Sequence, residues 1–196
     1  MSVLDRSEIG VAQRRKIFEL RNQYTLTDET GGVLGTVEQV KQSPFTFLAR
    51  LLSDLDVALP VTLAVRDAAG AEVLELHKPW FRMRVDVREP GGAMVGSVSR
   101  RLKIGKPVYV LSQGEQALGE LRAQDWRSRD FRVFDASERE VAKVTKQWRG
   151  IFTEAFTDAD TYAVILDPSL QGPLRTLAFA ATFAVDLVQK QKDTGW

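Results

Sequence analysis

The sequence has no cysteine and a single histidine, and both scarcities exclude kinds of chemistry. Without cysteine there is no disulfide framework, no thiolate metal site and no cysteine nucleophile, which fits a reducing compartment. His77 stands beside Lys78 and Pro79 with no serine or cysteine motif around it. Phosphate-loop and zinc signatures are missing, and the glycine-rich stretch 91–96 lacks the strand-then-helix context of a dinucleotide site. We therefore do not expect an enzyme, and we expect no cofactor except a weak calcium site considered below.

An excess of charge of one sign is also missing. The chain has 27 Lys and Arg against 26 Asp and Glu, which gives a net charge of +1. No global field steers the protein toward nucleic acid, so we expect no nucleic-acid partner. Any site for anions must be local.

Long hydrophobic runs are scarce. The first 18 residues contain no apolar stretch of signal-peptide length, and their basic cluster follows the apolar residues. The apolar run 174–188 is shorter than the roughly 20 residues that a span needs, and it contains Arg175 and Asp186. We therefore expect no transmembrane span and a cytoplasmic location, with peripheral attachment at the inner face of the plasma membrane as a further possibility.

Short alternating apolar runs, joined by turns rich in Asp, Gly, Pro and Ser, fill the centre of the chain. This pattern predicts five β-hairpins, at residues 24–40, 61–76, 81–102, 107–121 and 131–148. In the third hairpin the period of two places Phe81, Met83, Val85 and Val87 on the buried face, with Arg82, Arg84, Asp86 and Arg88 facing solvent. Further strands at 151–154 and 162–166 bring the total to about twelve.

A helix that is apolar all round is predicted at about residues 173–190. Such a helix is either a membrane span or the centre of a core, and its length and charges favour the core. A helix with side chains is about 10–12 Å across, too wide for an eight-stranded barrel but not for about twelve strands. The predicted fold class is therefore mainly β, a closed barrel of about twelve antiparallel strands around a buried C-terminal α-helix.

Two further segments complete the predicted organisation. Residues 1–15 are expected to form an N-terminal extension, and residues 16–196 a single barrel domain. The stretch 43–55 has a Ser43 cap, Pro44 at the first helical position and leucines at helical spacing. It is either a short helix that closes one end of the barrel or an interfacial helix that touches lipid.

The segment VAKVTKQWRGIFTEAFTDADTYAVIL, residues 141–166, followed by a helix ending in FAVDLV, resembles the phospholipid scramblase family. That family groups with the LURP-one-related and tubby C-terminal-like proteins. The resemblance is carried by Val144, Lys146, Gln147, Trp148, Glu154, Ala155, Phe156, Thr157, Asp158, Ala159 and Asp160. It implies a twelve-stranded barrel around a buried helix, calcium-dependent lipid scrambling in some members and phosphoinositide binding in tubby domains. The chain lacks the proline-rich region and the cysteine cluster typical of members that act at membranes.

Asp158 and Asp160 match the start of the proposed calcium segment of that family, with the D-x-D spacing of calcium loops. Counted from Asp158 as an EF-hand loop, the fifth, sixth and twelfth positions are Tyr162, Ala163 and Ser169, which lack the expected ligands and glycine. The alternatives are a turn set by Thr157 and Asp158, or a weak calcium site on the two aspartates.

The strongest functional signal is a set of basic residues in the third predicted hairpin and just after it: Arg82, Arg84, Arg100, Arg101, Lys103 and Lys106. Guanidinium groups pair with phosphate bidentately and ammonium groups act as point charges, so such a set can bind a phosphorylated head group. The other interpretation is a solvated barrel surface. We therefore expect a membrane-surface module that binds phospholipid or phosphoinositide head groups. The alternatives are calcium-dependent phospholipid scrambling and an intracellular signalling or protein-interaction scaffold.

Overall fold

The computed structural model describes residues 2–13, 23–40, 60–101, 108–125, 130–145 and 160–189. The predicted helix at 43–55 and the predicted strand at 151–154 lie outside these ranges, so both stay predictions.

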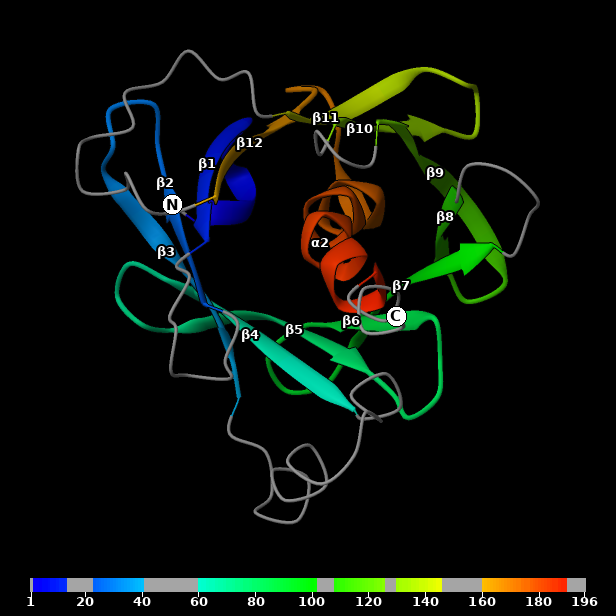
Figure 1. The fold of residues 1–196 in the computed structure, drawn as a ribbon, viewed down its shortest axis with the longest axis horizontal. Coiled ribbons are helices and arrows are strands. Elements are labelled where there is room, and N and C mark those ends of the chain that lie inside the picture. Colours follow the sequence, from blue (N-terminus) through cyan, green and yellow to red (C-terminus); the bar gives the residue numbers. More distant parts are fainter. Residues whose placement is uncertain are drawn as a thin grey trace, which may run out of the picture.

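The described strands form one closed antiparallel barrel, seen end-on in Figure 1. In chain order the strands are β1 (Glu8–Gln13), β2 (Gln23–Thr27), β3 (Val33–Gln39), β4 (Val61–Asp67), β5 (Glu72–Lys78), β6 (Arg84–Arg88), β7 (Met94–Arg101), β8 (Val108–Gln113), β9 (Gln116–Asp125), β10 (Asp130–Asp135), β11 (Glu140–Thr145) and β12 (Asp160–Leu166). Each strand pairs with its sequence neighbours, and the five predicted hairpins are confirmed as β2–β3, β4–β5, β6–β7, β8–β9 and β10–β11.

Strand β1 closes the barrel by pairing with β12 on one side and β2 on the other. Its residues fall in the range expected from the sequence to be an N-terminal extension, whereas the structure makes them part of the barrel wall. Four consecutive residues of β1, from Ile9 to Ala12, are buried. Burial on both faces removes the polar alternation that identified the other strands.

The inner face of the barrel is apolar. The register pairs Val85 with Val98, Leu76 with Val87, and Ile9 with Val164, and all six side chains are fully or almost fully buried. The predicted alternation in the third hairpin holds for Val85 and Val87 but is wrong for Phe81 and Met83, which are exposed. Strand β6 begins only at Arg84, so these two residues precede the part of the segment that faces the core.

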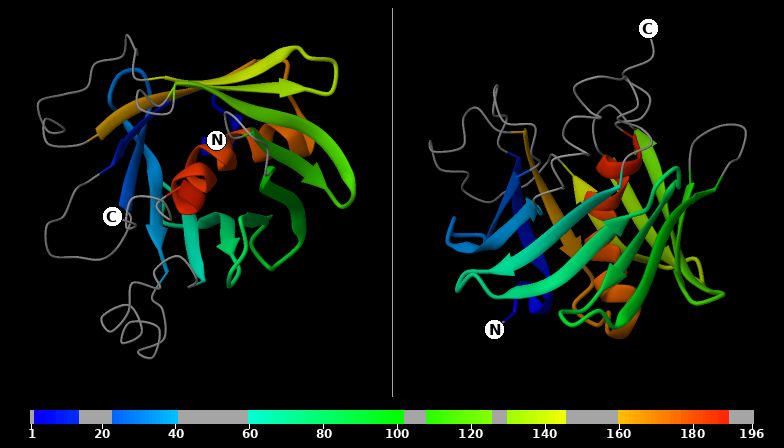
Figure 2. Two further views of the ribbon diagram at one scale, coloured as in Figure 1. Left: turned by 45° about the vertical axis from the view of Figure 1, so that its right-hand side comes forward. Right: turned by 90° about the horizontal axis from the view of Figure 1, so that it is seen from below.

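Helix α2 (Gly172–Gln189) runs lengthwise through the barrel, as Figures 1 and 2 show, which confirms the predicted central helix. All its residues from Leu177 to Val188 are buried. Two inward-facing glycines of the wall allow the helix to come close. A Cβ on Gly96 would overlap the carbonyl oxygen of Ser112 and lie 2.9 Å from Cδ1 of Leu177. A Cβ on Gly119 would overlap the carbonyl oxygen of Phe134 and lie 3.2 Å from Cδ1 of Leu174.

The two ends of the barrel differ. At one, here named the hairpin end, tight turns join the paired strands, and an aspartate at the start of several turns accepts backbone N–H bonds. Asp28 accepts from Gly32 at 2.8 Å, Asp67 from Ala71 at 2.9 Å and Asp135 from Arg139 at 3.0 Å. Hydrogen bonds hold the pKa values of Asp28 and Asp135 below their usual range. At the opposite end β5 and β7 finish and β6 begins, and there the C-terminal half of α2 reaches β2, where Tyr24 donates a hydrogen bond to Asp186 at 3.1 Å.

Candidate functional site

Four of the predicted basic residues come together at the opposite end of the barrel. Arg84 pairs with Ser99 across β6 and β7, and the backbone N–H of Arg100 donates to the carbonyl of Met83 at 2.9 Å. Residues 82–84 therefore lie alongside residues 99–101, which brings Arg82, Arg84, Arg100 and Arg101 to two neighbouring strand ends. The other two predicted members, Lys103 and Lys106, lie outside the described residues.

Carboxylates compensate the positive charge of two of these four arginines. Arg84 Nε lies 2.6 Å from Asp86 Oδ1, and a guanidinium nitrogen of Arg101 lies 2.8 Å from Glu120 Oε1. Arg82 differs, because it is exposed and forms no ion pair with any residue that the structure describes. The described cations without a carboxylate partner here are therefore Arg82 and Arg100.

Arg100 also differs from the others in direction. It is paired with the fully buried Tyr109 of β8, two residues beyond the inward-facing Val98, so it lies on the inner face at the barrel rim. Its Nε is buried and has no hydrogen-bond partner among the described residues. A buried guanidinium N–H without a partner is costly, and an anionic or carbonyl oxygen at the rim would relieve that cost.

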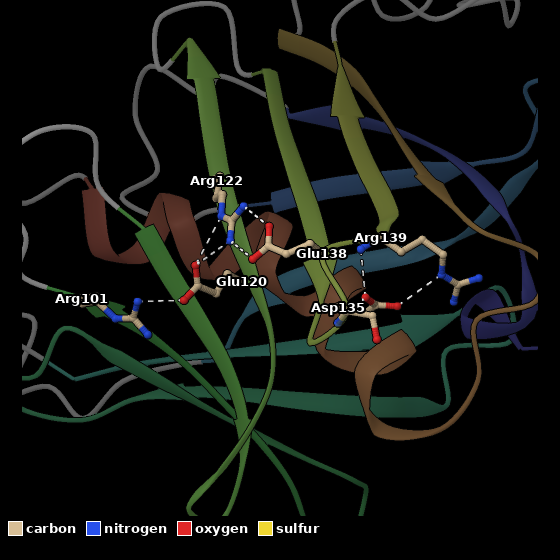
Figure 3. A network of polar contacts seen from close by, with 7 residues as sticks. Arg101, Glu120, Arg122, Asp135, Glu138 and Arg139 are labelled. Carbon is tan, nitrogen blue, oxygen red and sulfur yellow. Dashed lines mark hydrogen bonds and ion pairs between the residues drawn. The ribbon is translucent and has the colours of Figure 1, made fainter.

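The outer wall beside this site is held by a network of ion pairs (Figure 3). Glu120 receives Arg101 from β7 and Arg122 from its own strand β9, and Arg122 also forms a bidentate pair with Glu138 at 2.6 and 2.7 Å. The Arg122 guanidinium lies 4.9 Å from the centroid of the Phe134 ring. The hydrogen bonds that Arg122 donates to Glu138 lower the pKa of Glu138 and raise the pKa of Arg122. This network compensates its own charges, so the local excess of positive charge stays at the β6–β7 rim.

Exposed apolar side chains lie next to the basic residues. Trp80, Phe81 and Met83 all occur in the connection from β5 to β6 and are all exposed. The sequence prediction missed this feature because it extended the inward alternation of β6 back to Phe81. The signal available in the sequence was Pro79, which interrupts strand pairing just before the two aromatic residues.

The two other residue predictions have different outcomes. His77 faces outward on β5, where its Nδ1 lies 2.9 Å from Thr62 Oγ1 of the neighbouring strand, which is a cross-strand polar contact. Asp158 lies outside the described residues, and of Asp160 only the backbone is described, at the first position of β12 opposite Gln13. Among the described residues there is no group of three or more His, Cys, Asp or Glu that could hold a metal ion. The calcium site therefore stays a prediction.

No helix within the described ranges combines the length and the apolar character needed to cross a bilayer.

Comparisons with known proteins bear on both the fold and the family. The chain is 26% identical over 161 residues to phospholipid scramblase 1 of Mus musculus, covering 70% of this chain and 49% of the mouse protein. The human phospholipid scramblase 1 is likewise 26% identical over 161 residues, with 70% and 50% covered. The human phospholipid scramblase family member 5 is 22% identical over 187 residues, with 87% and 66% covered. The chain thus spans about half the length of the first two of these relatives.

A solved structure shares the architecture. The X-ray structure of a protein from Arabidopsis thaliana aligns with a TM-score of 0.55 at 18% identity, covering 92% of this chain and 91% of that protein. At this identity the likeness concerns the fold alone, and it matches the tubby-like barrel expected from the sequence. The sequence model of the Scramblase family matches residues 7–189, which include every described strand and all of α2. The chain belongs to the Scramblase family.

Proposed function

We propose that this barrel binds phospholipid head groups at a cytoplasmic membrane surface, through Arg82, Arg84, Arg100 and Arg101 together with Lys103 and Lys106. The observation that carries the proposal is the meeting of Arg82 and Arg100 at neighbouring strand ends, without a carboxylate partner among the described residues. Membership of the Scramblase family supports a lipid ligand.

The division of charge assigns different weights to these residues. Arg84 and Arg101 each spend part of their hydrogen-bonding capacity on Asp86 and Glu120, so a phosphate must compete with those carboxylates. Arg82 offers an exposed guanidinium, and Arg100 offers an N–H group at the rim. Planar guanidinium groups suit bidentate recognition of phosphate oxygens. Arg82 is therefore the residue whose loss should weaken head-group binding with the least damage to the fold.

Binding should be strongest to anionic vesicles at low salt and should fall in Arg82→Gln. One cation near an anionic surface contributes about 1 kcal/mol, so the partition coefficient should drop about fivefold. The measurement is sedimentation with phosphatidylcholine vesicles, alone or carrying phosphatidylserine or a phosphoinositide at matched surface charge. Preference for the phosphoinositide at equal charge would identify it as the ligand, and equal binding would indicate general recognition of anionic lipid.

A matched control for the loss of one positive charge is Arg139→Gln, because Arg139 lies at the hairpin end and pairs with Asp135 and Asp167. It should leave vesicle binding close to that of the unmodified protein. Equal losses in both variants would reduce the effect to net charge and contradict a site at the β6–β7 rim. Equally poor retention on neutral and anionic vesicles at low salt would contradict head-group binding altogether.

For head-group binding, α2 stays inside the barrel. Lipid scrambling by insertion of this helix would expose the inner apolar face of the wall, against a total stability of roughly 5–15 kcal/mol for a typical domain. It would also carry Arg175 and Asp186 into the bilayer, where each charge is costly.

Purified protein added to dye-labelled vesicles with calcium should therefore cause no flip-flop above that of protein-free vesicles. Calcium-dependent flip-flop that is lost in the double variant Asp158→Asn/Asp160→Asn would instead favour the scrambling function and the aspartate site together.

A further inference from the structure

The connection between β5 and β6 exposes an unusual amount of apolar surface. The exposed fractions are 47% for Trp80, 77% for Phe81 and 39% for Met83. Only three other large hydrophobic side chains in the described ranges are comparably exposed, namely Val33, Val40 and Met94. Single exposed apolar residues are ordinary, but three within four residues, two of them aromatic, indicate an interaction site, here named the apolar patch.

The backbone conformation of Phe81 strengthens this interpretation. Its φ is 53°, in the left-handed region that favours glycine and is uncommon for a bulky residue. The ring gains little burial in return, since its only aromatic contact in the described structure is with Trp80, at 6.2 Å between centroids. A glycine or asparagine would fit this backbone with less strain. The strained, exposed ring is therefore poorly explained by stability of the barrel.

Cations surround the apolar patch. Arg82 lies between Phe81 and Met83 in the sequence, Arg84 follows, and Arg100 is hydrogen-bonded through its backbone to Met83. Aromatic side chains beside exposed guanidinium groups match the layered chemistry of a bilayer surface, where apolar rings enter the interfacial layer and cations meet phosphates.

We propose that residues 80–83 form a membrane anchor, in which Trp80, Phe81 and Met83 enter the interfacial layer of an anionic bilayer while Arg82 stays at the level of the phosphates. This inference rests on the proposed function, because it uses the same rim. It adds a distinct claim, that part of the binding is apolar insertion and persists when salt screens the charges. A second copy of the chain is the competing occupant of the patch, and the experiments below separate the two.

The absence of cysteine allows a site-specific probe. In Phe81→Cys, a dye that brightens in apolar surroundings can be attached at the patch alone. The matched control is Ala69→Cys, in the exposed turn before β5, at the other end of a seven-residue strand that spans roughly 20 Å. With vesicles containing phosphatidylserine, the dye at position 81 should brighten, shift to the blue and be quenched by spin labels on the upper acyl chain. The dye at position 69 should do none of these.

A second experiment separates insertion from damage to the fold. Trp80→Ala/Phe81→Gly should lower the vesicle partition coefficient by about tenfold or more, because two partly exposed rings no longer reach the lipid. The same loss should appear at high salt. Since glycine relieves the φ of Phe81, the single variant Phe81→Gly should unfold at the same temperature as the unmodified protein or higher. Val33→Ala/Met94→Ala removes side chains that are 56% and 48% exposed at the hairpin end, and it should bind vesicles normally.

The outcomes distinguish the anchor from the head-group site. Binding to anionic vesicles with the dye at position 81 still in water would overturn the anchor and leave the head-group proposal standing. Failure of the unmodified protein and of every variant to bind any vesicle would overturn both the anchor and the head-group site. A blue shift at position 81 that depends on protein concentration and occurs without lipid would assign the patch to a second copy of the chain and overturn the anchor.

Discussion

Replacing Phe183 by alanine should lower the free energy of unfolding by about 3–5 kcal/mol, the usual cost of removing a fully buried phenylalanine. Phe183 is 0% exposed and lies at the centre of the buried face of α2. Its ring meets Tyr24 of the wall edge-on at 5.1 Å and Phe179 of the same helix at 5.3 Å. The barrel cannot collapse easily around the lost ring, because hydrogen bonds close its wall in a complete circle.

Urea unfolding followed by circular dichroism measures this effect. The control is Met94→Ala, which shortens an exposed side chain at the start of β7 and should change stability by less than about 0.5 kcal/mol. A loss below about 1 kcal/mol in Phe183→Ala would contradict the central place of α2 in the core.

Replacing Arg175 by methionine should cost about 3 kcal/mol, since charged donors make the stronger hydrogen bonds and their carbonyl partners are part-buried. The guanidinium donates to four backbone carbonyls at the hairpin end. Nε reaches Leu4 at 2.8 Å and Nη2 reaches Arg6 at 2.8 Å, while Nη1 reaches Leu170 at 3.1 Å and Asp167 at 3.3 Å. One side chain of α2 thus joins the N-terminal segment to the link between β12 and the helix.

Urea unfolding gives the magnitude, and hydrogen exchange tests the mechanism. Amides from Leu4 to Gln13 should exchange faster in Arg175→Met, because the segment before β1 loses its anchor to the helix. Arg175→Lys keeps the charge but lacks the planar fork of donors, so it should recover only a minor part of the loss. Arg139→Met, on the surface, should cost less than about 1 kcal/mol. Equal effects of the two methionine variants would contradict the tether.

Local sequence signals predicted most of the fold. Alternating apolar runs joined by turns rich in Asp, Gly, Pro and Ser identified the hairpins, because such turns form from adjacent residues alone. The all-apolar surface of α2 then predicted a barrel of about twelve strands, since an eight-stranded barrel has room only for its own side chains. Strand β1 was missed because both its faces are buried, and burial on the outer face depends on packing that no local pattern records.

The site was only partly predictable, because contacts between strands that are distant in the sequence leave no local pattern. The clustering of Arg82, Arg84, Arg100 and Arg101 follows from hairpin pairing and was expected. The carboxylate partner of Arg101 was not, because Glu120 lies 19 positions away on β9 and reaches it across β8. The exposure of Phe81 was also missed, since the apolar alternation extends in the sequence to residues before Arg84, where β6 begins, and the interruption at Pro79 was not taken into account.

The closure of the barrel by β1 and β12 has a consequence for how the protein is made. The pair joins Ile9 to Val164, and α2 follows β12 in the chain, so a ribosome must synthesise nearly the whole sequence before the wall can close around its core. Contacts this distant in sequence slow folding. Until α2 emerges, the nascent strands have an apolar inner face with no helix to cover it, and such exposed apolar surface is prone to aggregation during synthesis.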